Sequence, residues 1–351
     1  YLSKFEALPV DSEVKLQRPF AEMKEICKSY PISEGESEED NTYLSLSRVV
    51  GSCLDRELYI AFQILDYALC SAPGAPLKQA LIEEGIGTEV YSIFDEGIRQ
   101  PYFSVIAKNA NLQQKEAFLA TYRRVLTKLA KEGIDKKSLY ARLNYFEFKH
   151  READFGSYPK GLMYGLQMLD SWLYDESKPF IHVEANETFA ALKEKIGEGY
   201  FEKLIEEHLL DNEHGSVVVL VPEKGLTAKR DQALAEKLQA YRETLSAEEV
   251  QGIVRETKEL KAYQEEGDTP EALACIPHLT REDIRREANK YVNELREAAG
   301  IPVLYHELFT NGIGYLRLSF DCSRVPGELF PYLGLLKNMM GLIDTDSYSY
   351  G

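Results

Sequence analysis

Two histidines near residue 210 are the closest match to a metal-binding pattern in this sequence. His208 and His214 lie on either side of Glu213 in the order His-Leu-Leu-Asp-Asn-Glu-His. Inverted zinc motifs, His-x-x-Glu-His, place two imidazoles one helical turn apart, with a carboxylate beside them as general base. The spacing here is two residues too long, and the Asp-Asn pair before Gly215 predicts a turn. We therefore predict solvent-facing polar residues before a strand, not a metal site.

The other candidate groups lack partners at useful spacing. Glu147 and His150 form a single Glu-x-x-His element, whereas a di-iron bundle needs two, so we predict a charged helix face. His182, His278 and His306 stand alone, and there is no Gly-x-Ser-x-Gly nucleophile motif or phosphate-binding glycine loop. The sequence therefore predicts no catalytic, cofactor-binding or metal-binding residue in this chain.

Composition and charge exclude several classes of protein. The chain has 351 residues and a net charge of −17, from 41 basic and 58 acidic side chains. This charge repels phosphate backbones, and no run is long and apolar enough for a membrane span, so we expect neither nucleic-acid nor membrane binding. The first residues do not resemble a signal peptide, and the odd number of scattered cysteines predicts a cytoplasmic protein with free thiols: Cys27, Cys53, Cys70, Cys275 and Cys322.

Local patterns predict an α+β fold, with an antiparallel sheet packed against helices. Residues 42–50 alternate apolar and polar side chains, as in a half-buried strand. Asp55 precedes a helix with one apolar face, and helices follow at about 112–131, 136–152 and 161–172, the last with four leucines on one side. The acidic stretch 34–41 is interpreted as a solvated hairpin connection, and residues 216–222 as a central strand. Strands mixed with helices, with sheet pairs close in sequence, favour α+β layers.

Residues 226–270 are much more charged than the rest of the chain. Two helical stretches meet at Ser246, and Glu249 three residues later completes a capping signature. Two helices joined by a short turn form a helical hairpin, which we interpret as a linker between domains.

A repeat follows this linker. Residues 315–319 (Tyr-Leu-Arg-Leu-Ser) resemble 43–47 (Tyr-Leu-Ser-Leu-Ser), and 328–330 with the leucines beyond resemble 57–59 and the helix there. We therefore expect a second, truncated copy of the first domain. The predicted organisation is an entry segment at 1–17, a complete α+β domain at 18–225, the hairpin linker at 226–270, and the truncated copy at 271–351.

Two long runs carry a family resemblance. Residues 147–162 (Glu-Phe-Lys-His-Arg-Glu-Ala-Asp-Phe-Gly-Ser-Tyr-Pro-Lys-Gly-Leu) and 302–316 (Pro-Val-Leu-Tyr-His-Glu-Leu-Phe-Thr-Asn-Gly-Ile-Gly-Tyr-Leu) resemble the presequence-protease branch of the insulinase-like (pitrilysin-like) zinc metallopeptidases. The likeness extends over essentially the whole chain.

The resemblance implies a role within a larger enzyme. Members of that branch have two bowl-shaped halves, each of two α+β domains, which are joined by a helical hairpin and close around a chamber that degrades unfolded peptides. This chain would be the noncatalytic second domain, the hairpin and the start of the third domain, forming chamber wall and hinge. The family's zinc motif belongs to the first domain, so no catalytic or zinc-binding residue is carried onto this numbering. The alternative is a catalytically inactive scaffold or partner subunit of the same family.

Overall fold

The computed structural model describes residues 2–6, 8–288 and 290–347. These residues form two compact units: one from 2–29, 37–222 and 310–347, and the other from 30–36 and 223–309. Within the described residues, no helix has both the length and the apolar character needed to cross a membrane.

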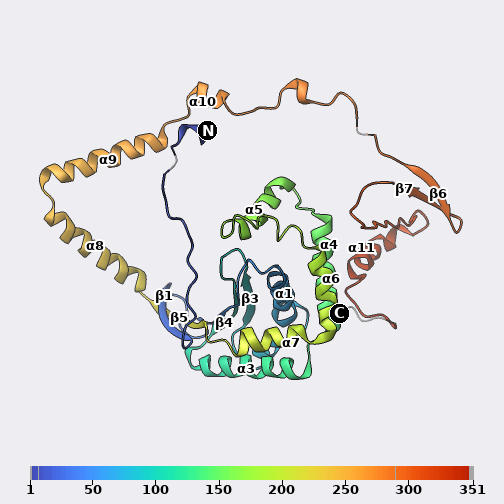
Figure 1. Cartoon of the computed structure of the whole chain (residues 1–351), viewed down its shortest axis with the longest axis horizontal. Helices are drawn as coiled ribbons and strands as arrows, with labels where there is room; N and C mark the ends of the chain where they lie inside the picture. Colours follow the sequence, from blue (N-terminus) through green and yellow to red (C-terminus); the bar gives the residue numbers. More distant parts are fainter. Residues whose placement is uncertain (1, 7, 289, 348–351) are drawn as a thin grey trace. The chain divides into compact units, whose positions relative to one another are not determined.

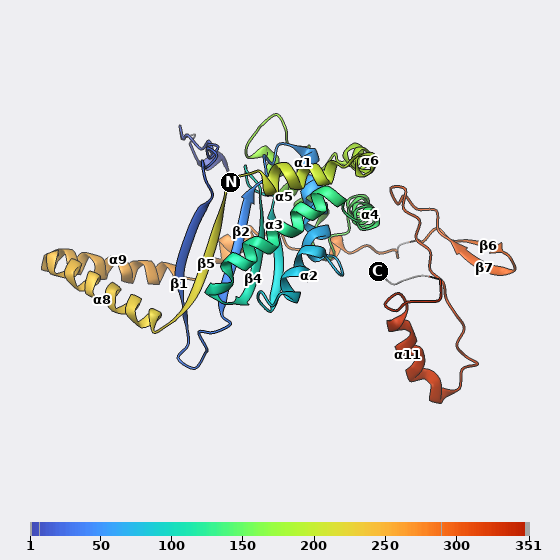
Figure 2. The ribbon, with the colours of Figure 1, turned by 90° about the horizontal axis from the view of Figure 1, so that it is seen from below.

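A five-stranded sheet organises the larger unit (Figures 1 and 2). Its strands lie in the order β1-β5-β2-β4-β3, and the pairs β2–β4, β2–β5 and β3–β4 are antiparallel. The α+β fold with an antiparallel sheet is therefore confirmed. The strand bounds are β1 Lys24–Ile32, β2 Thr42–Val49, β3 Glu89–Asp95, β4 Tyr102–Ala110 and β5 Gly215–Lys224.

Helices pack against one face of this sheet. Their bounds are α1 Arg56–Asp66, α2 Pro76–Glu83, α3 Lys115–Glu132, α4 Lys136–Glu152, α5 Lys160–Trp172, α6 Asn186–Lys195 and α7 Tyr200–Leu204. The Asp55 side chain accepts a hydrogen bond from the Leu58 backbone N–H, 3.0 Å away, so the predicted cap of α1 is confirmed.

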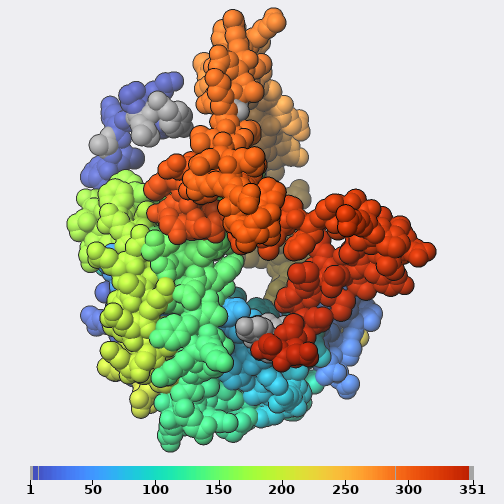
Figure 3. Space-filling view, turned by 90° about the vertical axis from the view of Figure 1, so that its right-hand side faces the viewer, coloured from blue at the N-terminus to red at the C-terminus, as the bar shows by residue number. Residues whose placement is uncertain are grey.

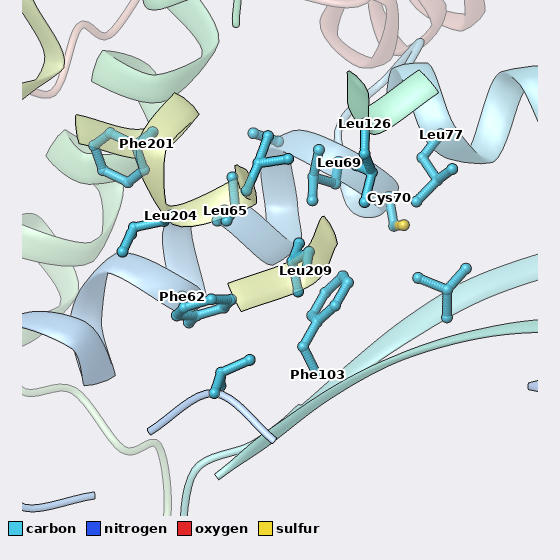
Figure 4. Packing of buried hydrophobic residues seen from close by; sticks show 14 of the residues in the cluster. Phe62, Leu65, Leu69, Cys70, Leu77, Phe103, Leu126, Phe201, Leu204 and Leu209 are labelled. Atoms are coloured by element: carbon cyan, nitrogen blue, oxygen red, sulfur yellow. The ribbon is translucent and has the colours of Figure 1, made fainter. Parts of the chain in front are cut away.

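The core lies between the sheet and these helices (Figure 4). Along β2 the side chains are alternately buried and half-buried, as the sequence pattern predicts, and Leu44 and Leu46 point into the core. Phe62 of α1 and Phe103 of β4 meet there with ring centroids 6.5 Å apart. Burying an aromatic or leucine side chain contributes about 1.5–3 kcal/mol, so this layer holds the sheet in place.

The connection between β1 and β2 differs from the predicted hairpin. Residues 33–40 are exposed, as expected, but β5 lies between β1 and β2, which are therefore not paired with each other. Neighbouring strands in sequence need not pair when a later strand provides better apolar contacts, and Val217 and Val219 of β5 are buried against the core. The expectation that β5 lies inside the sheet is confirmed, although its side chains alternate in burial at its start.

The helical hairpin forms where the sequence predicts it. Helices α8 (Leu226–Thr244) and α9 (Ala247–Glu265) meet at Leu245 and Ser246, and the Ser246–Glu249 capping box is present. Neither helix has a buried residue. The same unit contains a short helix, α10 Pro270–Ala274, and an antiparallel ribbon of β6 Glu294–Ala298 and β7 Ile301–Tyr305.

The repeated segment is only partly built like the first copy. The helix expected beyond residue 328 is present as α11 (Phe330–Met339) in Figure 1, but residues 315–319 do not form the expected strand. In the first copy, β2 obtains its hydrogen bonds from β4 and β5 on its two sides. Among the described residues, 315–319 have no such strand partners, and an isolated strand is not stable.

Candidate functional site

The histidines near residue 210 do not form a metal site. His208 packs edge-on against Phe62 with ring centroids 5.6 Å apart, and His214 packs edge-on against Phe20 at 5.0 Å. The intervening Glu213 accepts a hydrogen bond from the Met23 backbone N–H at 3.3 Å. His214 is buried and His208 is half-buried, so the prediction that they face solvent is wrong for His214 and only partly right for His208, whereas Glu213 is exposed as predicted. Burial lowers the pKa of both imidazoles. Within the part of the chain that is described, no three His, Cys, Asp or Glu side chains gather as metal ligands.

Glu147 and His150 have structural contacts. The Glu147 carboxylate accepts a hydrogen bond from Arg151 Nε at 2.9 Å and is ion-paired with Lys193 of α6. His150 lies against the Phe189 ring, 5.5 Å between centroids, and burial lowers its pKa. Both residues therefore hold α4 against α6, the two helices that lie side by side in Figure 3.

His182 occupies a less expected place. Its ring is only 2% exposed and stacks on the Tyr59 ring with centroids 3.9 Å apart. Neither ring nitrogen forms a hydrogen bond of normal geometry, and burial lowers the pKa of His182 to about 4. His182 is therefore a neutral packing residue. Of the other histidines, Nδ1 of His306 lies 3.1 Å from the Val292 carbonyl oxygen, and His278 is exposed.

A pair of half-buried acids near Tyr59, on which His182 stacks, is not apparent in the sequence. Tyr59 Oη donates a hydrogen bond to Asp170 Oδ2 at 3.0 Å, which joins α1 to α5. Burial raises the pKa of Asp170, and burial together with the nearby Asp170 charge raises that of Glu96. The one sequence signal was an acidic residue, Asp170, within the apolar pattern of α5. The Cys53 thiol lies near Asp170, but burial raises its pKa to about 11, and among the described residues no metal ligand set accompanies these acids, so we assign them to packing.

The sheet face opposite the helices is a candidate binding surface. On this face Ser104 Oγ lies 3.1 Å from Ser45 Oγ and 2.8 Å from Ser47 Oγ, so three hydroxyls form a chain across β2 and β4. Tyr43 and Val49 of β2 are half-buried on the same face. This mixture of hydroxyl and apolar groups can contact an extended chain without preferring one side-chain type.

A cavity of about 530 Å³ lies at one end of this face. Its walls include Phe20, Ser47, Val49, Tyr102, His214 and Ser216. The segment 14–17 borders it: Gln100 Oε1 accepts from the Gln17 N–H at 2.6 Å, Gln100 Nε2 donates to the Gln17 carbonyl at 3.1 Å, and Arg99 donates to the Val14 carbonyl. Apolar, hydroxyl and basic side chains line this cavity, and its volume is in the range of clefts that bind small ligands.

Two family models match the chain. Residues 1–144 match a model described as "Peptidase M16 inactive domain", and residues 220–351 match a model for the region associated with subfamily C of the M16 peptidases. A curated relative, protein HypA of Clostridium perfringens, is 40% identical over 350 residues, covering 100% of this chain and 36% of that protein. Presequence protease 1 of Arabidopsis thaliana, chloroplastic/mitochondrial, is 32% identical over 95% of this chain and 32% of its own length.

The chain belongs to the M16 peptidase family, in its presequence-protease branch. It spans about a third of the length of the curated relatives it matches. Among solved structures, the periplasmic protease PqqL of Escherichia coli aligns with 62% of this chain and 22% of its own, at 13% identity and a TM-score of 0.43.

The M16 match shows that this is a noncatalytic section. The model that covers residues 1–144 is the one described as inactive, and it includes the whole of β1 to β4 with α1 to α3. The resemblance drawn from residues 147–162 and 302–316 is therefore confirmed. The exact domain boundaries proposed from the sequence stay a prediction.

Proposed function

We propose that this chain is the noncatalytic middle section of a zinc-dependent endopeptidase that degrades unfolded peptides. The observation that carries the proposal is the inactive-domain match within a chain whose relatives are named presequence proteases. The catalytic zinc would be bound by a part of the longer protein outside these residues. The residues of this chain do not fit that metal, because the candidate imidazoles of His208 and His214 pack against separate aromatic rings.

The sheet supports a role as chamber wall. Helices cover one face and bury Leu44 and Leu46, whereas the other face carries half-buried hydroxyl and apolar groups. A layer with one stabilised face and one accessible face can line a chamber without unfolding at its surface. The adjoining 530 Å³ cavity would hold a side chain of a peptide inside it.

The hairpin supports a role as hinge. Helices α8 and α9 are joined by a two-residue turn at Leu245 and Ser246 and bury no residue. Because neither helix buries a side chain, the backbone dihedral angles at this turn can change at a low cost in free energy. We also propose a cytoplasmic location, since the five cysteines follow no disulfide or metal spacing.

The test uses the longer protein and the 351-residue chain side by side. The longer protein should cleave an unfolded fluorogenic peptide, lose activity to a chelator, and regain it with zinc, and the shorter chain should show no cleavage. Chelator-sensitive cleavage by the shorter chain alone would contradict the noncatalytic assignment. A longer protein that binds peptides but never cleaves them would favour the inactive scaffold subunit.

A further inference from the structure

The C-terminal end of α4 is met by a turn from much later in the chain. Asn311 Nδ2 donates a hydrogen bond to the Arg151 carbonyl oxygen at 3.1 Å, and Tyr315 Oη donates to Glu152 Oε1 at 3.2 Å. α4 ends here, because Ala153 adopts the left-handed conformation with φ 46°. The last carbonyl groups of a helix have no partner within the helix, so Asn311 satisfies one that the fold leaves open.

The turn has a shape that presents this amide. Asn311 and Gly312 have φ values of +54° and +81°, and the Ile313 N–H donates to the Thr310 carbonyl at 3.1 Å. Two consecutive left-handed residues in a closed four-residue turn are the signature of type I′, for which Asn-Gly is a preferred sequence. Thr310 Oγ1 donates a further bond to the Ile313 carbonyl at 2.6 Å. The turn therefore presents the Asn311 side chain to α4, and because its backbone is already fixed, it loses little conformational entropy when it docks.

The receiving surface on α4 is also ordered in advance. Glu147 links Arg151 of the same helix to Lys193 of α6, and Glu152 forms an ion pair with Lys149 at 3.1 Å. The Glu152 side chain is 17% exposed. Its carboxylate therefore stays near the position at which Tyr315 reaches it.

We propose that the C-terminal end of α4 is a docking surface for the Thr310–Tyr315 turn, and that this contact is a reversible latch. It joins residues 310–347 to the helical layer by a non-covalent link, in addition to the chain that connects them. The two runs with the clearest family resemblance, 147–162 and 302–316, thus meet in space. The consequence for access rests on the proposed function: if this section is a hinge, opening the chamber must break the latch.

The test measures docking directly, without any peptidase assay. Spin labels are placed at Asn144→Cys on α4 and Lys337→Cys on α11, both exposed, in a chain with Cys27, Cys275 and Cys322 changed to serine. Pulsed electron spin resonance then gives the distribution of distances between the labels. The variant Asn311→Asp with Tyr315→Phe removes both donors and keeps a residue that tolerates the left-handed turn. Tyr332→Phe, at a 65% exposed tyrosine of α11, is the matched control.

The unaltered latch should give one narrow distance population, and the control should reproduce it. Loss of two hydrogen bonds should lower the ratio of docked to undocked molecules by about tenfold, which broadens the distribution. A narrow distribution that survives in the double variant would overturn the latch, and so would a broad one in the unaltered chain. Neither result depends on whether the longer protein is a peptidase, so failure of the latch is distinguishable from failure of the proposed function.

Discussion

The buried imidazole of His182 predicts a specific dependence of stability on pH. We consider His182→Phe, which keeps an aromatic ring stacked on Tyr59 and removes the titrating group. Burial holds the pKa of His182 at about 4 in the folded chain, and the nearby Arg56 charge lowers it further from the ordinary value of about 6.5. The folded state therefore favours the neutral ring, and the stability from His182 is lost as pH falls through the range between these two values.

The magnitude follows from these two pKa values. Keeping the ring neutral costs well under about 1 kcal/mol of folding free energy at pH 7 and about 2 kcal/mol at pH 5. Between pH 7 and pH 5 the unaltered chain should therefore lose about 2 kcal/mol more than the His182→Phe variant. Asp170 and Glu96 change the stability with pH in the opposite direction, because burial raises the pKa of both carboxyl groups. Comparing the two chains cancels that contribution, because both contain the acids.

Urea unfolding followed by fluorescence measures this difference. The chain has one tryptophan, Trp172, at the end of α5, close in sequence to Asp170, which binds Tyr59. His278→Phe, at an exposed histidine, is the matched control and should follow the unaltered chain at both pH values. Equal losses of stability in the unaltered chain and in His182→Phe would refute the reasoning, because His182 would then titrate as it does in the unfolded chain.

Three further predictions concern the core, the thiols and the hairpin. Phe62→Ala should lower the free energy of unfolding by about 3–5 kcal/mol, because the ring is fully buried, whereas Phe309→Ala, at a 94% exposed ring, should change it little in the same urea titration. A thiol reagent should count five thiols in denatured, unreduced protein, but Cys53 and Cys70 should react slowly in the folded chain, since burial raises their thiol pKa to about 11 and about 12. A count of three or fewer would mean that disulfides are present. Apart from the termini and the acidic loop, limited trypsin digestion should cut first within residues 226–309, where no described side chain is buried; first cuts inside residues 42–70 or 160–173 would contradict this.

Local chemistry explains which elements could be predicted from the sequence. The cap of α1 depends on Asp55 and a backbone N–H three residues away, and the burial of β2 depends on simple alternation. Both signals are complete within a few residues. The order of the strands is different, because β5 pairs with β2 across more than 160 intervening residues, as in the pairing of Ser47 with Ser216. No pattern within either strand specifies that partner.

The leucines of α5 show the limit of periodicity more clearly. Their spacing predicts a helix with one apolar side, and the helix forms, but Leu162, Leu166 and Leu173 are 52%, 49% and 67% exposed. Periodicity specifies a face and not what covers it. Instead, α5 is fixed by the hydrogen bond between Tyr59 and Asp170 and by Ser171 Oγ, which donates to the Lys178 carbonyl at 2.6 Å. Such contacts depend on residues that are brought together only by the fold.

The side chains with shifted pKa values do not mark an active site among the described residues. Shifted pKa values often mark catalytic groups, because catalysis needs a titrating group that substrate can reach. Glu147, Asp170 and His182 have shifted pKa values, but each contacts a neighbouring element of the fold, and none of these three lines the cavity beside the open sheet face. His214 does line it, but its imidazole packs edge-on against Phe20, and the other lining residues include hydroxyl, apolar and basic side chains such as Ser47, Val49 and Arg99. The half-buried acids therefore stabilise contacts between elements of the fold, and the sheet face and its cavity can contact a bound chain, as we propose for this section of an M16 peptidase.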